Sequence, residues 1–218
     1  MVFPGLQSGQ ASKDYSCGSS SPTVVAYNSS PVYQVLGLES TYRTSNTSSL
    51  TTTDPLVIAA HGGCSPGGIK IVGGEGTFYA DAITSAKSTL TSTGRTNVQK
   101  AIILISDGDA SASSSNMPTA EKNNQCHEAI TAAQSATTSG FWVYSIAYGA
   151  ASTGCSTDSP SITPCAALLA IASDSTKFFA DSSSSCPSGV NSTSGLTNLF
   201  QNIGTSLTSA RMLPDNTN

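Results

Sequence analysis

Apolar residues recur at helical spacing in three segments of the C-terminal two-thirds of the chain. Within each segment, apolar side chains three or four positions apart share one face of a helix. Glycine or proline bounds several of these segments, as is typical of helix ends. The pattern predicts helices over GGEGTFYADAITSAKSTL, around residues 120–138 and over GLTNLFQNIGTSLTSARML, with a shorter helix over PCAALLAIAS.

Short apolar runs lie between these helices. AIILIS and FWVYSIAYG are too short for independent buried helices, so each predicts a buried parallel strand, and KFFA predicts a shorter third strand. From residue 75 onward helices and strands therefore alternate. Such an alternation implies right-handed crossovers and a parallel sheet with helices on both faces. The predicted fold class is α/β, with a doubly wound and mostly parallel sheet.

The first 70 residues are less regular. MVFPGL is an apolar run broken by proline and glycine and predicts the end of a strand, and PVYQVLGLESTYRT has the composition of a second strand. Polar stretches rich in Ser and Thr surround both. We expect a single domain over 1–213, with Ser/Thr-rich insertions at about 7–31 and 44–68, followed by a tail at 214–218.

Charge is scarce in this chain. Charged residues make up 10% of its 218 residues, against about 25% in ordinary soluble domains. Ser, Thr, Asn and Gly fill the polar positions instead, which favours an exported protein. The net charge is −4 and Lys and Arg do not cluster, so nucleic acid is not an expected partner. MVFPGLQSGQ lacks the pattern of a signal peptide, and nothing approaches the ~18 apolar residues of a membrane span.

Six cysteines lie mostly in loops rich in Ser, Gly and Pro. None belongs to a C-x-x-C pair, which argues against zinc and thioredoxin-like motifs. Disulfides in an oxidising compartment are the preferred interpretation, and scattered free thiols are the alternative. Six cysteines allow 15 pairings. Our preferred pairs are Cys126–Cys155, Cys165–Cys186 and Cys17–Cys64.

A carboxylate stands at the end of the AIILIS strand. Asp107 begins an Asp-Gly pair, which is a common turn signal, so a turn is the simplest role for it. In parallel sheets, however, functional residues gather in the loops at the carboxyl ends of the strands. The loop GGEGT adds a hydroxyl, that of Thr77, at a predicted helix start. A hydroxyl and a carboxylate are suitable ligands for a hard divalent cation such as Mg²⁺.

These segments together resemble a von Willebrand factor type A domain, and more closely the bacterial pilus-assembly proteins of the TadE/G-like group. The resemblance implies that Thr77 and Asp107 belong to a metal-ion-dependent adhesion site, and that YQVLGLESTYR forms an antiparallel edge strand. The segments that carry it are GGEGTFYADAITSAKSTL, KAIILISDGDAS, FWVYSIAYG, VFPGL, CHEAITAAQ and LFQNIGTSLTSARML.

One element of the family pattern is missing. The family's metal site begins with D-x-S-x-S, and this sequence contains no such motif at the matching place. The resemblance thus implies that the central first strand, the first helix and an N-terminal membrane anchor lie upstream of Met1. In that case MVFPGL would pair directly with AIILIS or leave a gap one strand wide. The chain alone would bind Mg²⁺ weakly or not at all.

The resulting functional prediction is a non-enzymatic adhesion or assembly module of a bacterial surface or Tad/Flp-type pilus-assembly protein. Its expected partner is a pilus or cell-envelope protein, and its expected location is the periplasm or the cell surface. The alternative is a secreted hydrolase that uses His61 in the same cleft, although no G-x-S-x-G elbow is present. Nucleotide binding is disfavoured because no G-K-[ST] follows GGEG. His127 is expected to be exposed.

Overall fold

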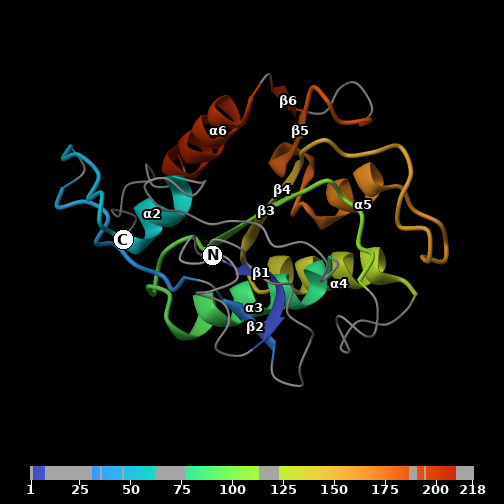
Figure 1. Ribbon diagram of the computed structural model, residues 1–218, viewed down its shortest axis with the longest axis horizontal. Helices are drawn as coiled ribbons and strands as arrows, with labels where there is room; N and C mark the ends of the chain where they lie inside the picture. The colour runs from blue at the N-terminus through green and yellow to red at the C-terminus, as the bar shows by residue number, and fades with distance from the viewer. Residues whose placement is uncertain are drawn as a thin grey trace, which may run out of the picture. The chain divides into compact units, whose positions relative to one another are not determined.

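A computed structural model of the chain describes residues 2–7, 31–34, 36–45, 47–61, 77–112, 123–186, 191–193 and 195–209 (Figure 1). The chain forms two compact units. The first comprises Met1–Gly94 and Ser111–Lys122, and the second comprises Arg95–Ala110 and Asn123–Asn218. The single domain expected over 1–213 stays a prediction.

The second unit is built on a four-stranded, entirely parallel sheet. Its order is β3-β4-β5-β6. The predicted runs AIILIS and FWVYSIAYG form adjacent parallel strands, with Ile103 opposite Tyr144, so the α/β fold class is confirmed at this level. The strands are β3 (Ala101–Ser106), β4 (Trp142–Ala147), β5 (Phe178–Asp181) and β6 (Asn191–Thr193).

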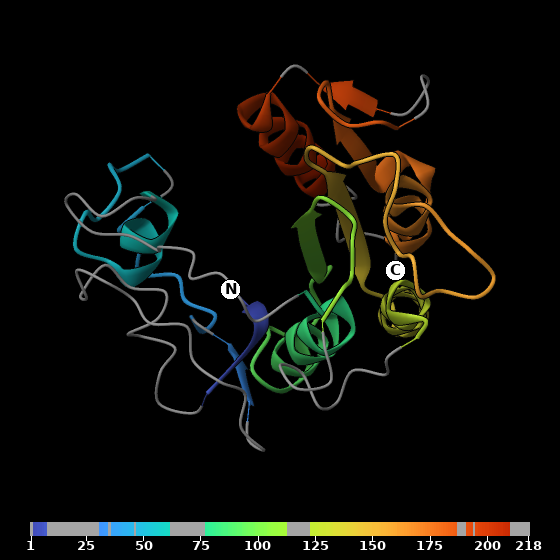
Figure 2. The same cartoon turned by 45° about the vertical axis from the view of Figure 1, so that its right-hand side comes forward.

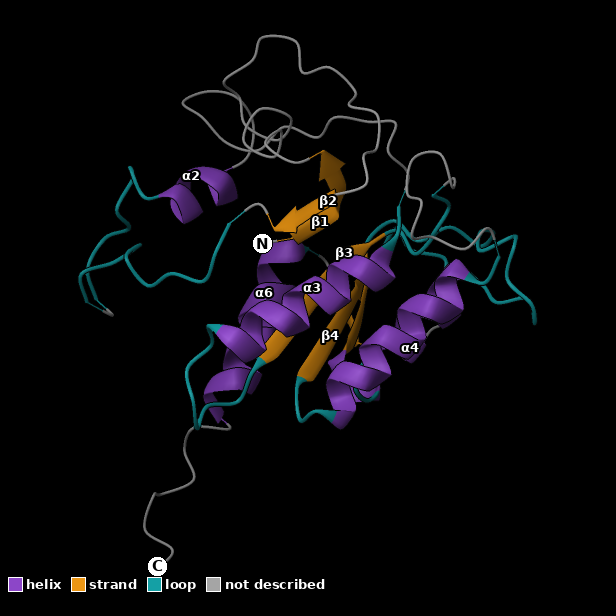
Figure 3. Cartoon of the chain, turned by 90° about the horizontal axis from the view of Figure 1, so that it is seen from below, coloured by secondary structure: helices purple, strands orange, loops and turns teal. Residues whose placement is uncertain are grey.

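Helices cover both faces of this sheet. In Figures 2 and 3, α6 lies on one side of β4, and α4 lies on the other. The contact between α6 and the sheet is a buried cluster of Tyr144, Ile146, Phe179, Leu199 and Ile203. The helices of this unit are α4 (Gln125–Thr138), α5 (Pro164–Ile171), the single 3₁₀ turn η1 (Ser175–Lys177) and α6 (Leu196–Ser209).

Helix α4 begins at Gln125 rather than near Ala120, where the apolar pattern placed its start. The reason lies in the backbone of Asn124, which has φ +67° and is left-handed, a conformation that cannot continue a right-handed helix. Small buried residues, Ala129 and Ala133, then allow α4 to pack closely on its neighbours. Local backbone geometry therefore overrides the periodic signal at this end.

Among its described residues, the first unit holds a two-stranded antiparallel sheet and two helices. Its elements are β1 (Val2–Gln7), β2 (Pro31–Gln34), α2 (Pro55–His61) and α3 (Tyr79–Ser92). Strand β1 continues through Pro4 and Gly5, and its register shifts between Val2 and Leu6, which is how a strand accommodates a proline that lacks an N–H group. The expected antiparallel edge strand of the parallel sheet is not observed: β2 is antiparallel, but it pairs with β1 in a sheet of two strands.

The first unit differs from the sequence prediction in two details. A strand was expected over YQVLGLESTYR, but β2 ends at Gln34 and residues 36–45 contain no strand. Helix α2 was not expected from the apolar pattern. Asp54 explains this helix: its Oδ1 accepts a hydrogen bond from the backbone nitrogen of Leu56 at 2.9 Å, and Pro55 occupies the favoured first position.

Candidate functional site

The parallel register brings the carboxyl ends of β3, β4 and β5 to one edge of the second unit, here called the carboxyl edge. It consists of the loops 107–110, 148–163 and 182–186. Asp107 follows β3 directly, as the sequence predicts, and is exposed. The Ser106 hydroxyl lies 3.4 Å from Asp107 Oδ1 and accepts a hydrogen bond from the Gly108 nitrogen at 3.1 Å.

Thr77 lies two residues before α3 and is half-buried. Its backbone carbonyl accepts a hydrogen bond from the Ser111 nitrogen at 3.1 Å. Thr77 belongs to the first unit and Asp107 to the second. The approach of Thr77 to Asp107, which a shared cation would require, therefore stays a prediction.

Gly108 fixes the course of the loop after β3. Its φ of +89° is left-handed, and a Cβ at this position would lie 2.7 Å from Pro164 Cβ and 2.9 Å from Leu168 Cδ1. Only glycine allows both this conformation and this approach to α5. The residue thereby holds the segment that carries Asp107 against the start of that helix.

Asp109 connects two loops of the carboxyl edge. Its Oδ1 accepts a hydrogen bond from the Cys155 nitrogen at 2.7 Å. Cys155 has φ +50° and follows Gly154, where a Cβ would lie 2.6 Å from Pro164 Cγ. The β3 and β4 loops are thus held together by a carboxylate and by close backbone packing.

Asp181 makes the corresponding connection between the loops after β4 and β5. Its Oδ1 accepts hydrogen bonds from the Gly149 nitrogen at 2.8 Å and the Ser184 hydroxyl at 2.5 Å. Its Oδ2 accepts from the nitrogen and the hydroxyl of Ser183. Burial raises the pKa of Asp181, but these hydrogen bonds outweigh it and hold the pKa well below its usual value.

Two disulfides brace the carboxyl edge. Cys126–Cys155 joins the start of α4 to the β4 loop with a Cα separation of 6.0 Å, and Cys165–Cys186 joins α5 to the β5 loop with a separation of 5.4 Å. Both pairings match the sequence expectation. Both Cys17 and Cys64 lie outside the described residues. Two disulfides indicate an oxidising setting. In the part of the chain that the structure describes, no helix is long and apolar enough to cross a membrane.

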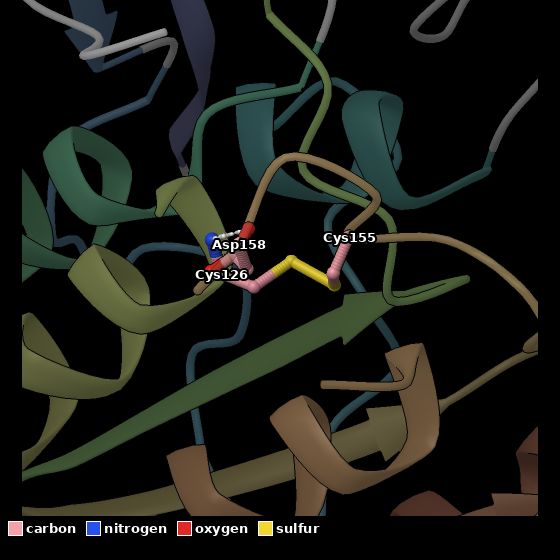
Figure 4. Close-up of side chains that lie close together, drawn as sticks. All are labelled: Cys126, Cys155 and Asp158. Carbon is pink, nitrogen blue, oxygen red and sulfur yellow. Dashed lines mark hydrogen bonds between the residues drawn. A yellow bond between two sulfur atoms is a disulfide. The ribbon is translucent and has the colours of Figure 1, made fainter. Parts of the chain in front are cut away.

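A buried group lies beside the first disulfide (Figure 4). The sulfur atoms of Cys126 and Cys155 and a carboxylate oxygen of Asp158 lie within 4.8 Å of one another. The Asp158 side chain has no exposed surface, and its Oδ1 accepts hydrogen bonds from His127 nitrogen at 2.9 Å and His127 Nδ1 at 2.7 Å. While the disulfide is intact, the two sulfurs are not thiolate ligands.

Asp158 also explains how α4 starts. Asn124, the residue before this helix, makes no side-chain cap. The Asp158 carboxylate caps it from the β4 loop instead, through the His127 nitrogen and a longer 3.4 Å contact to the Cys126 nitrogen. An anion at a helix N-terminus also interacts favourably with the helix dipole. His127 is therefore engaged by Asp158 and only 33% of its side chain is exposed, contrary to the expectation of a simply exposed residue.

Sequence reasoning missed Asp158 and Asp181 because their partners are distant. Asp158 acts on residues 31 and 32 positions away, and Asp181 on a residue 32 positions away. An isolated aspartate in a polar loop gives no signal of such a partner. His61 ends α2, and its side chain lies outside the described residues.

The chain was compared with protein-family models, with curated proteins and with solved structures, and none of the three comparisons finds a match.

Proposed function

We propose that the chain is a non-enzymatic adhesion or assembly module with a Rossmann-like fold of the von Willebrand factor type A kind. The observation that carries the proposal is Asp107, an exposed carboxylate directly after β3 on the carboxyl edge of a parallel sheet. Ligands of such sheets bind at this edge. The loops of the carboxyl edge are braced by disulfides and by hydrogen-bonded carboxylates, which suits a surface that binds a protein partner without rearranging.

The proposed cofactor is a divalent cation such as Mg²⁺. Thr77 and Asp107 would supply a hydroxyl and a carboxylate oxygen, both hard ligands. Two side chains leave most octahedral positions to water, and no D-x-S-x-S motif stands at the place where the resembled family has it, although the pattern itself occurs at 109–113 and 181–185. The chain by itself is therefore expected to bind Mg²⁺ weakly or not at all.

The proposed partner is a pilus or cell-envelope protein, in the periplasm or on the cell surface of a bacterium. The low share of charged residues and the two disulfides support an extracytoplasmic location. Membrane anchoring is a further part of this proposal and comes only from the family resemblance.

Calorimetry with Mg²⁺ and Mn²⁺ on the full chain tests the metal site. Weak binding that disappears in Asp107→Ala and in Thr77→Ala supports the proposal. Tight binding that persists in both variants contradicts it, because the cation would then sit elsewhere.

Capture of purified pilin from solution, with Mg²⁺ or with a chelator, tests the function itself. We expect retention on the immobilised chain only with the cation, and loss of retention in Asp107→Ala. Retention that ignores both the chelator and the variant would contradict the role of Asp107. Ester or peptide hydrolysis that is lost in His61→Ala would favour a hydrolase instead.

A further inference from the structure

We propose that Cys126, Cys155 and Asp158 form a redox-gated metal site: reduction of the disulfide creates a two-thiolate, one-carboxylate set that binds a thiophilic divalent cation such as Zn²⁺. The three ligands do not include Asp107, and the site does not depend on the proposed adhesion function. It rests on the three ligand atoms that already lie within 4.8 Å of one another (Figure 4).

The geometry of the group suits tetrahedral Zn²⁺. Zinc binds cysteine sulfur at about 2.3 Å and carboxylate oxygen at about 2.0–2.2 Å, so neighbouring ligand atoms in a tetrahedral site lie roughly 3.5–3.8 Å apart. Once the disulfide is broken, the two sulfurs move apart to van der Waals contact, which is close to that spacing. The three atoms then need only side-chain rotation to surround one cation, and a water takes the fourth position.

Burial couples metal binding to the deprotonation of the two cysteines. Cys126 and Cys155 are fully buried, and the Asp158 side chain has no exposed surface. Without a metal the two reduced sulfurs remain neutral thiols, because two thiolates beside a carboxylate would place several negative charges out of water. A divalent cation bound to all three ligands compensates these charges and allows both thiols to lose their protons.

Asp158 is already oriented for the role. Its Oδ1 is held by the backbone nitrogen and Nδ1 of His127, at 2.9 and 2.7 Å. Among the described residues its Oδ2 makes only the 3.4 Å contact to the Cys126 nitrogen, so Oδ2 is the oxygen left to bind a cation. A ligand carboxylate fixed through its second oxygen is the usual arrangement around protein-bound zinc. His127 is thus a positioning residue.

The redox step is a thiol–disulfide exchange with a dithiol as reductant. The dithiol gives two electrons and two protons to the Cys126–Cys155 bond and becomes a disulfide itself. The two new thiols then release two protons as their sulfurs bind the cation. Because both cysteines are buried, the dithiol can attack only when the loop 148–163 opens.

The test uses the full chain with Cys17, Cys64, Cys165 and Cys186 replaced by serine, so that a single cysteine pair remains. The chain is reduced with a dithiol, desalted without oxygen and titrated with Co²⁺, whose thiolate charge-transfer absorption reports sulfur ligation. We expect one Co²⁺ per reduced chain, displacement by Zn²⁺ and no such absorption in the oxidised chain. Absence of charge-transfer absorption in the reduced chain overturns the proposal.

Asp158→Asn in the same background tests the third ligand, and Asp174→Asn is its control because Asp174 is an exposed carboxylate paired with Lys177. We expect at least tenfold weaker Co²⁺ binding for the first and no change for the second. Circular dichroism without metal shows whether each reduced chain is folded. Folding on addition of metal also supports the proposal, whereas equal affinity in Asp158→Asn, folded or unfolded, overturns it.

Discussion

At the scale of single residues, carboxylates connect the loops of the carboxyl edge to one another and to the start of α4. Asp109, Asp158 and Asp181 each accept a hydrogen bond from a backbone nitrogen at least 31 positions away in the chain. Such bonds between an ionised acceptor and an amide are stronger than neutral ones. The loops are therefore fixed by charge-assisted contacts as well as by apolar packing.

Asp181→Asn is expected to lower the free energy of unfolding at neutral pH by about 1–3 kcal/mol, nearer the lower value because Asp181 is half-buried. The pKa of Asp181 is lower in the folded than in the unfolded chain. Its contribution is thus fully present above the unfolded value of about 3.9 and is lost as the pH falls from there toward the folded value. Urea unfolding at about pH 7 and about pH 3 measures the difference in unfolding free energy between the parent chain and Asp181→Asn. The same difference at both pH values would contradict the role of the Asp181 charge.

Gly108→Ala is expected to destabilise the protein more than Gly140→Ala. The two glycines have nearly the same φ, +89° and +83°, and the left-handed conformation costs an alanine about 1–2 kcal/mol at either position. At Gly140 nothing lies within 4 Å of the added Cβ, whereas at Gly108 Pro164 and Leu168 lie under 3 Å away. Overpacking should add about 1–3 kcal/mol. Equal urea midpoints for the two variants would show that the contact with α5 relaxes freely.

At the scale of elements, the two disulfides close chain loops of similar length, but their cysteines differ in burial. The closed loops span 29 and 21 residues, for which chain entropy gives about 3–4 kcal/mol each. Cys126 and Cys155 are fully buried, whereas Cys186 is partly exposed. Because the two disulfides should contribute similar chain entropy but differ in burial, removing each in turn shows what burial adds to stability.

The double variant Cys126→Ser, Cys155→Ser should lose more stability than Cys165→Ser, Cys186→Ser. The first change buries two hydroxyl groups, which adds roughly 1–3 kcal/mol each where no partner is found. Thermal unfolding of both variants in oxidising buffer shows which of them loses more stability. The reverse order would show that the second bond secures a larger part of the fold.

The spacing of apolar residues predicted those helices and strands that bury one face or all of their side chains. The strands β3 and β4 and the helices α3 and α6 follow from the spacing of their apolar residues, because a buried face needs that spacing. Strand β6, with the sequence NST, carries no apolar signal, and its strand conformation comes from pairing with β5. The position of Asp107 was predictable from the strand before it, whereas the connections through Asp158 depend on contacts that only the folded chain reveals.

At the scale of the whole molecule, β3 is one of the two edge strands of the parallel sheet among the described residues, and β6 is the other. Ile103 and Ile105 on β3 are 40% and 44% exposed, whereas Ile102 on the opposite face is buried. An apolar edge strand with unpaired backbone groups favours association with other strands. Self-association is therefore the expected behaviour of the isolated chain.

Replacing Ile103 and Ile105 with threonine should reduce this association while keeping the preference for strand conformation. Sedimentation velocity over a range of concentrations should shift toward the monomer. Ile102→Thr is the matched control: it should lower stability, because it places a hydroxyl in the core, without reducing association. If the unsubstituted chain is a monomer at all concentrations, the exposed isoleucines of β3 do not cause self-association and the prediction is wrong.

The two disulfides also determine how the chain would respond to a pulling force. Strand β4 lies inside the covalent ring closed by Cys126–Cys155, and β5 lies inside the ring closed by Cys165–Cys186. Tension applied along the backbone is carried by the two disulfide bonds and not by the chain between the paired cysteines. These spans of 29 and 21 residues therefore cannot be extended. At about 3.3–3.6 Å per residue, roughly 170 Å of contour length is withheld until the bonds are reduced. The centre of the sheet would remain looped while the chain outside the rings is drawn out.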